Sequence, residues 1–375
     1  MDGLVTLMLN RLKQILSRQS SEEAPDSESL PEGSGILVNA YCTRKAVPKL
    51  TFRHRLIAAR GRPDAELDQH LDGFVGYVTS RGAAQMTQMK YHVLLHIGRV
   101  RQQFSFFVDE TQMDAMSAWA VAANAIIFLP DGHVRDPNGR VLVSASGGEP
   151  EAEAAVPYPP EARQRKAATE AFLEAKGIRV LPNLPPVVAE PELDLRSPQD
   201  VAVRALALLT VAVRAEALAH KNPMSREERR ERLPASIVKL TPKETAFFDH
   251  DAPAQIDVVQ FAWRYECLAV LAWALGLVAD LPFPEGICDV AKTVQVMLAT
   301  SPATLVKRAR LRDPGQILDA LDLHYRLHWY ATEIRLGRKE ALPGLESGVI
   351  KERHYALNWL VGFEGAEWDD VQTTT

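Results

Sequence analysis

Two charged residues, Arg264 and Glu266, lie in an otherwise mostly apolar segment, Ile256 to Val278, that we expect to form one helix. Burying an unpaired charge costs free energy, so each side chain must find a partner of opposite charge. One interpretation is an active site in which Glu266 is catalytic, with a shifted pKa, and Arg264 binds the ligand. The other is a structural ion pair that fixes how two helices pack.

The segment from Pro314 to Gly337 also combines charged and aromatic residues on a predicted helix. At helical spacing one face carries Ile317, Leu321, His324 and His328, and the opposite face carries Asp319, Asp322, Arg326 and Glu333 beside Trp329. Asp322 and Arg326 are four residues apart and can form an ion pair. The charged face is either a solvated surface or a groove. In a groove, Asp322 would be a catalytic candidate, and Arg326 and Trp329 would bind a ligand or partner.

His324 and His328 have the spacing that places two imidazoles on one side of a helix. With a carboxylate from another helix they could bind zinc or iron. A zinc protease would need a glutamate directly after the first histidine, and Tyr325 occupies that position. Because the pair shares its face with aliphatic residues, core histidines are the favoured interpretation, and we assign no metal.

Glu352, Arg353 and His354 open the last predicted helix, Val349 to Phe363, with Asn358 one turn after His354. A helix N-terminus favours an acid and can bind an anion. If these residues gathered near Arg264 and Glu266, they would form an acid–base pocket, with Glu352 and His354 catalytic and Arg353 and Asn358 binding. A helix cap within a buried polar network is the alternative.

Several catalytic and cofactor motifs are absent from the sequence. It contains no GxxxxGK[ST] or GxGxxG phosphate-binding loop and no GxSxG nucleophile elbow, so we expect no cofactor. The three cysteines, Cys42, Cys267 and Cys288, are far apart and form no CxxC pair. This argues against a disulfide framework and a cysteine zinc site, and it favours a reducing, cytoplasmic location.

Composition excludes some classes of partner. The chain has 375 residues and a formal net charge of -5, with 46% hydrophobic and 24% charged residues. This is an ordinary globular composition without the basic excess typical of nucleic-acid binding. One local basic cluster remains as a weaker hypothesis for nucleic-acid contact: Arg44, Lys45, Lys49, Arg53, His54, Arg55, Arg60 and Arg62. The longest apolar run, Cys267 to Val278, is too short to span a bilayer.

The pattern of elements predicts an α+β fold, with a small N-terminal α/β sandwich followed by a larger all-α domain. We expect an N-terminal helix and acidic linker in 1–35, the α+β domain in 36–144, a Pro/Glu-rich linker with one short helix in 145–197, and the all-α domain in 198–375. The N-terminal helix, Met1 to Gln19, could pack on the domain, bind at an interface or mediate homo-oligomerisation.

Within the α+β domain we expect strands at Ile36–Cys42, Phe74–Thr79, Phe104–Val108 and Ala125–Leu129, helices at Gln85–Val100 and Met113–Asn124, and an irregular, partly helical stretch at Arg44–Arg62. Asn138-Gly139 between apolar runs predicts a hairpin whose two central residues adopt positive φ. In the C-terminal half, Ser197-Pro198 and Thr241-Pro242-Lys243-Glu244 are helix-start signals.

A set of separated blocks in the C-terminal half resembles a known family. These are WRYE at 263–266, LP at 281–282, RDPGQILDALD at 312–322, ERHYALNWL at 352–360 and WDDV at 368–371. The chain resembles the bacterial domain-of-unknown-function family 4272 over roughly Arg196–Thr375, and more weakly over Gly73–Val143. The resemblance implies a related fold and a bacterial origin. It implies no activity, because the family has none assigned.

Two functional hypotheses remain open at the level of the sequence. Plentiful aromatic and charged residues without a catalytic signature favour a non-enzymatic module that binds another protein, for which we hypothesise a bacterial defence or immunity setting. The alternative is a hydrolase-like enzyme with an acid–base or metal pocket formed by Glu266, Asp322, Glu352 and His354.

Overall fold

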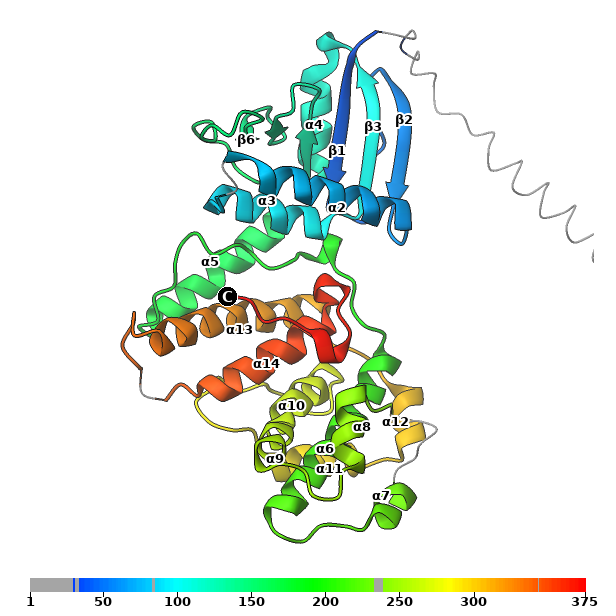
Figure 1. Cartoon of the computed structure of the whole chain (residues 1–375), viewed down its shortest axis with the longest axis vertical. Coiled ribbons are helices and arrows are strands. Elements are labelled where there is room, and N and C mark those ends of the chain that lie inside the picture. The colour runs from blue at the N-terminus through cyan, green and yellow to red at the C-terminus, as the bar shows by residue number, and fades with distance from the viewer. Residues whose placement is uncertain (1–29, 31–33, 83–84, 233–238, 343) are drawn as a thin grey trace, which may run out of the picture. The chain divides into compact units, whose positions relative to one another are not determined.

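The structure is a computed structural model that describes residues 30, 34–82, 85–232, 239–342 and 344–375. The chain divides into two compact units, with the boundary between Pro157 and Tyr158. The first unit contains an antiparallel sheet and the second is helical, so the predicted α+β class is confirmed (Figure 1). The predicted helix Met1 to Gln19 lies outside the described residues.

A six-stranded antiparallel sheet forms the centre of the first unit, with strand order β2-β3-β1-β4-β5-β6. The elements of this unit are β1 (Ile36–Cys42), β2 (His54–Gly61), α2 (Ala65–Ser80), α3 (Gln88–Arg99), β3 (Gln102–Val108), α4 (Met113–Ala123), β4 (Ala125–Phe128), β5 (Val134–Arg135) and β6 (Val141–Val143).

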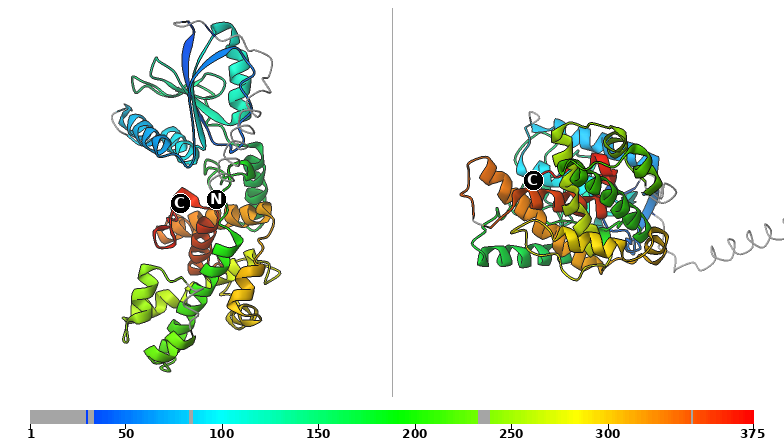
Figure 2. Two further views of the ribbon diagram at one scale, coloured as in Figure 1. Left: turned by 90° about the vertical axis from the view of Figure 1, so that its right-hand side faces the viewer. Right: turned by 90° about the horizontal axis from the view of Figure 1, so that it is seen from below.

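Alternate residues of β1 contact opposite layers, because successive side chains of a strand point to opposite faces of the sheet. Val38, Ala40 and Cys42 pack in the core that contains Trp119 of α4. Tyr41 faces the other way and stacks on Phe74 of α2, with ring centroids 4.2 Å apart. Helices therefore cover both faces of the sheet, with α4 on one side and α2 on the other (Figures 1 and 2).

Two local predictions in this unit were wrong. Phe74–Thr79 is the end of helix α2, whose buried residues Leu67, Leu71, Phe74 and Val78 follow a helical period that begins before the segment assigned as a strand. The stretch Arg44–Arg62 is not partly helical, because it contains strand β2.

The predicted hairpin at Asn138-Gly139 is confirmed, since β5 and β6 pair antiparallel. Its turn differs from the prediction, because Gly139 has a φ of +85° but Asn138 is not in the positive-φ region. Asp136 organises the turn instead, with its Oδ1 accepting hydrogen bonds from the backbone N–H of Asn138 and Arg140. The Asp136 side chain thus stabilises a turn that has only one of the two expected residues at positive φ.

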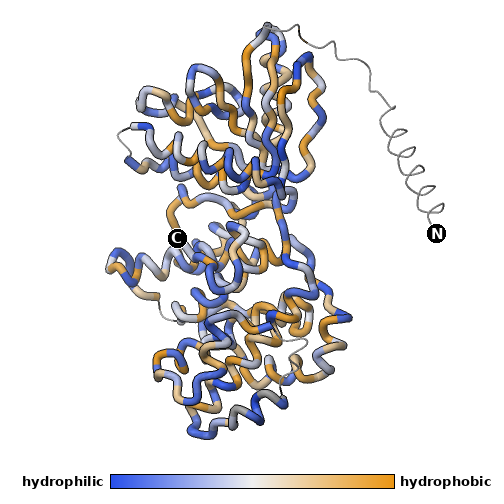
Figure 3. The backbone as a smooth tube through the Cα atoms, turned by 45° about the vertical axis from the view of Figure 1, so that its right-hand side comes forward, coloured by the Kyte–Doolittle hydropathy of each residue, from blue (hydrophilic) through white to orange (hydrophobic). Residues whose placement is uncertain are grey.

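The second unit is helical. Its elements are α5 (Pro160–Ala175), α6 (Pro198–Ala219), α7 (Arg226–Arg232), α8 (Pro242–Asp249), α9 (Gln255–Ala262), α10 (Arg264–Ala274), α11 (Val290–Leu298), α12 (Pro302–Arg308), α13 (Pro314–Arg335), α14 (Ser347–Leu360) and the short 3-10 helices η3 (Glu190–Glu192), η4 (Phe363–Gly365) and η5 (Trp368–Asp370). Most of its elements pack around a large hydrophobic core, and α8 and α9 pack against α6 in a smaller one. Figure 3 shows hydrophobic and hydrophilic residues interspersed along these helices, as expected where one side of a helix is buried.

Both predicted helix-start signals are confirmed. The Ser197 side chain accepts a hydrogen bond from the N–H of Asp200, with Pro198 in the first turn of α6. Thr241 and Glu244 form a reciprocal capping box at the start of α8. Each cap satisfies backbone N–H groups that have no partner within the helix.

The predicted single helix Ile256–Val278 is two helices, α9 and α10, with Trp263 between them. The sequence has no proline or glycine at this break, so no local signal marks it. The Trp263 indole lies against Gly348 of α14, where a Cβ atom would come within 2.8 Å of Cη2. The break therefore coincides with a close contact to a distant part of the chain.

Among the described residues, no helix combines the length and hydrophobicity needed to cross a lipid bilayer.

Candidate functional site

Two ion pairs join α10 to α14, and together they use four of the predicted site residues. Arg264 Nη1 lies 2.8 Å from Glu352 Oε2, and Arg353 Nε lies 3.0 Å from Glu266 Oε2. Each helix supplies one negatively charged and one positively charged side chain. The sequence identified all four charges but could not pair them, because the partners are more than 80 positions apart.

The Glu266–Arg353 pair is buried, with side chains only 3% and 2% exposed. Glu266 Oε1 accepts a hydrogen bond from the Cys288 N–H at 2.5 Å, and Arg353 Nη1 donates to the Pro282 carbonyl at 2.6 Å. Both oxygens of Glu266 are therefore engaged. The pair therefore holds the loop between α10 and α11 in place against α10 and α14.

The Arg264–Glu352 pair is partly open, with side chains 22% and 16% exposed. The Arg264 guanidinium lies 5.0 Å from the centre of the Tyr355 ring, and the Cys267 thiol donates to Glu352 Oε2 at 3.2 Å. Burial, with the neighbouring Glu352 carboxylate, raises the pKa of Cys267 well above its usual value. Cys267 therefore stays a neutral thiol and does not supply a thiolate nucleophile.

Glu352 does not lie at a helix N-terminus, contrary to the prediction. Helix α14 begins at Ser347, so Glu352 is in its second turn, where the carboxylate pairs with Arg264 and not with the free N–H groups of the helix start.

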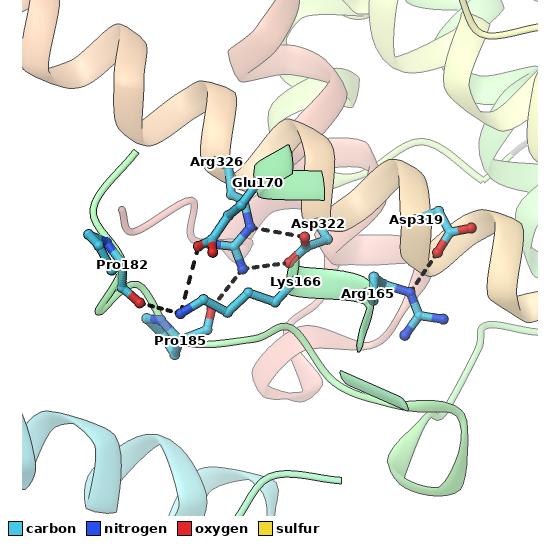
Figure 4. A network of polar contacts seen from close by, with 8 residues as sticks. All are labelled: Arg165, Lys166, Glu170, Pro182, Pro185, Asp319, Asp322 and Arg326. Carbon is cyan, nitrogen blue, oxygen red and sulfur yellow. Dashed lines mark hydrogen bonds and ion pairs between the residues drawn. The ribbon is translucent and has the colours of Figure 1, made fainter. Parts of the chain in front are cut away.

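Asp322 and Arg326 form the predicted ion pair, but both side chains are fully buried. Arg326 donates to both oxygens of Asp322 at 2.9 Å and also contacts Glu170 Oε1 of α5 at 3.1 Å (Figure 4). Asp319, on the same predicted face, is exposed and contacts Arg165 of α5 at 2.7 Å. For Asp322 and Arg326 the solvated-face interpretation is wrong, because α5 covers them.

Three histidines gather between α13 and α14, with His324 and His354 buried and His328 half-buried. His328 Nδ1 lies 2.9 Å from His354 Nδ1, and His324 Nδ1 contacts the Ala320 carbonyl at 2.8 Å. Burial lowers the pKa of His324 and of His328 to about 4, and it lowers the pKa of His354 well below the usual value. All three are therefore neutral at pH 7. In the described part of the chain, no three His, Cys, Asp or Glu side chains are arranged to bind a metal ion.

The remaining predicted binding residues make separate contacts. Asn358 Nδ2 donates to the Gln372 carbonyl at 2.8 Å, so it holds the C-terminal segment while His354 pairs with His328. Trp329 is buried, with the Lys339 ammonium 5.6 Å from its ring. Among the described residues, these candidates are thus engaged in contacts separate from the two ion pairs between α10 and α14.

The basic cluster of the first unit is partly used within the sheet. Arg60 Nη1 donates to Gln103 Oε1 at 2.8 Å, and Arg62 Nε donates to the Val100 carbonyl at 2.9 Å. The Arg55 guanidinium lies 4.5 Å from the Phe107 ring centre. These contacts account for the three arginines as supports of β2 and its neighbours.

A pocket of about 640 Å³, which the sequence did not reveal, opens beside α8 and α9 in the second unit. Its walls come from α8, α9, the start of α10, α14 and η5, and they include Phe247, Asp257, Phe261, Arg264, Tyr355 and Asp369. Of the predicted site residues only Arg264 lines it. No signal in the sequence could have found it, because its walls come from segments more than 100 positions apart.

Fold and site therefore define a helical domain with paired buried charges and an open pocket. The family described as Domain of unknown function (DUF4272) matches residues 165–371, more than half of the chain, and the chain belongs to this family. The match begins within α5, earlier than the resemblance suggested, and does not include Gly73–Val143, where the resemblance stays a prediction. No curated protein and no solved structure matches the chain.

The buried Glu266–Arg353 pair predicts a large effect on stability. Arg353→Met should lower the free energy of unfolding by about 3–5 kcal/mol, because it leaves the Glu266 carboxylate buried without a counter-ion. The matched control is Arg338→Met, which removes an ion pair to Glu333 in which the arginine is 65% exposed, and this should cost less than about 1 kcal/mol. Urea unfolding measures both, and equal losses would show that the buried pair has no special role.

The histidines between α13 and α14 predict acid sensitivity of the second unit. Their folded-state pKa values lie below the ordinary value of 6.5, so the stabilisation is fully present above that pH and is lost as pH falls toward 4. The free energy of unfolding should fall by up to about 1.4 kcal/mol per pH unit for each such histidine.

Tryptophan fluorescence during urea unfolding between pH 7 and 5 can measure this slope, because Trp119 is the only tryptophan before position 158. His324→Leu should make the slope shallower, whereas His220→Asn, at an exposed position, should leave it unchanged. An unaltered slope in His324→Leu would contradict the assignment.

Proposed function

We propose that this protein is a non-enzymatic binding module of the bacterial cytoplasm, and that its second unit binds another protein through α9 and the adjoining pocket. The observation that carries the proposal is the exposure of α9. Val258 is its one fully buried residue, while Ile256 is 63% and Val259 is 45% exposed. Two large apolar side chains one turn apart on a surface helix are typical of a protein interface.

The pocket continues this surface. Asp257, Gln260, Phe261 and Arg264 have the spacing of one helix side and line the pocket, and each of the exposed residues Ile256 and Val259 directly precedes one of them. The apolar residues therefore lie on an adjoining side of the same helix. An exposed apolar surface on a helix that also lines a pocket offers a partner both hydrophobic contact and a place to insert a side chain.

The state of the other candidate residues supports binding over the alternative, a hydrolase-like acid–base or metal site. A general acid or base must be able to reach a substrate proton. Both oxygens of Glu266 and of Asp322 accept hydrogen bonds from the protein itself, and His354 is paired with His328. These contacts explain the unusual charges as helix-positioning groups.

The cytoplasmic part of the proposal is supported by the cysteines. All three are free thiols, with Cys42 and Cys267 buried and Cys288 partly buried. Unpaired cysteines are typical of proteins in a reducing compartment.

Site-specific photo-crosslinking tests the proposal. A photoreactive residue at Val259 should crosslink a discrete partner in lysate of the native cell, while the same residue at Leu181 should not. Leu181 is a matched control because it is 47% exposed, outside α9 and outside the pocket. The double change Ile256→Asp and Val259→Asp should abolish recovery of that partner without lowering stability by more than about 0.5 kcal/mol. Identical crosslinks from both positions, or a partner retained by the double variant, would refute an α9 interface.

A further inference from the structure

The pocket beside α9 contains more acidic than basic side chains. Glu244, Asp257 and Asp369 line it, against Lys243 and Arg264. The charge of Arg264 is offset by Glu352 at 2.8 Å, and that of Glu244 by Arg204. Lys243 Nζ donates to the Asp369 backbone carbonyl at 2.8 Å, and the Lys243 backbone N–H donates to Asp369 Oδ2 at 3.1 Å. The carboxylates of Asp257 and Asp369 form no ion pair within the described residues. A cation entering the pocket would therefore meet a net negative charge, because the ammonium of Lys243 offsets only one of these two carboxylates.

Glu244 provides a second, independent observation. It is 1% exposed and lines the pocket, and its Oε2 accepts hydrogen bonds from Arg204 and from the Thr241 N–H. Its Oε1 is buried and has no hydrogen-bond partner in the part of the chain that the structure describes. A buried acceptor without a donor is costly, so a ligand that brings N–H groups would gain from supplying one.

Aromatic rings form part of the pocket walls, and two of them lie close to arginine side chains of the protein itself. Phe247 and Phe261 stack with centroids 4.1 Å apart. Arginine guanidinium groups lie 5.1 Å from the Trp368 ring and 5.0 Å from the Tyr355 ring. Rings of this kind attract cations through their negative faces and pack against the aliphatic stem of a long basic side chain.

We propose that the pocket receives a lysine or arginine side chain of the partner protein, with Asp257, Asp369 and Glu244 as its acceptors. This inference rests on the proposed function, because it names the chemistry of the partner at the same surface. The pocket volume of about 640 Å³ accommodates such a side chain with its flanking backbone. An acidic side chain directed at Arg264 is disfavoured, because Glu352 already neutralises that guanidinium and the other carboxylates would repel a second acid.

Three blocked pentapeptides test the proposal, identical except for lysine, norleucine or glutamate at the centre. Each is titrated into the full chain while the indole N–H signal of Trp368, which lines the pocket, is followed by NMR. The lysine peptide should bind with a Kd at least about tenfold lower than the norleucine peptide, and added salt should weaken it. Tighter binding of the glutamate peptide, equal binding of lysine and norleucine, or no binding of any peptide would overturn the inference.

Two pocket variants locate the effect. Asp257→Asn and Asp369→Asn should each weaken binding of the lysine peptide about tenfold, because each removes a negative charge but keeps an oxygen acceptor. Asp280→Asn, at an exposed position outside the pocket, should leave binding unchanged. If the pocket variants bind lysine as the unchanged chain does, the cation site is wrong. The α9 crosslink would then still decide the proposed function, since it does not depend on these carboxylates.

Discussion

The cost of burying charge is the constraint on which the helical unit depends. A buried ion without a counter-ion destabilises a fold by several kcal/mol, so each charge that the core encloses must be matched by a charge from elsewhere in the chain. Three arginines and three acids meet this requirement in the second unit, as the pairs Arg353–Glu266, Arg326–Asp322 and Arg204–Glu244. Two of these pairs join different helices directly, and the third reaches α5 through Glu170. The charges therefore specify which helices lie together.

This constraint also accounts for the contacts of the residues with catalytic potential. Glu266, Asp322 and His354 could each carry acid–base chemistry, but their polar atoms are bound to partners that hold helices in place. The same cost keeps the histidines neutral and Cys267 protonated, because burial favours the uncharged form of a group that lacks a counter-ion.

The pocket differs from the buried pairs in one respect, which is that its charges are incompletely matched. Arg264 and Glu352 form its partly open ion pair, whereas the carboxylates of Asp257 and Asp369 line the pocket with only the one ammonium of Lys243 nearby. Because the pocket is open to solvent, water can hydrate these carboxylates in the absence of a ligand. A surface that tolerates unmatched charge is suited to recognise a partner, and α9 provides the apolar area beside it.

The sequence by itself determined the fold class, most helices of the second unit, two of their N-terminal caps and the family, because periodicity, capping residues and motif order are local properties. It also identified the unusual charges Glu266, Asp322, Arg326 and Arg353, but not the buried Arg204–Glu244 pair. Only the tertiary structure decided that Arg264 pairs with Glu352 and Arg353 with Glu266, and that a pocket opens beside α9. Pairing and pocket shape arise between segments far apart in the chain, and no local pattern encodes which of several acids a buried arginine will meet.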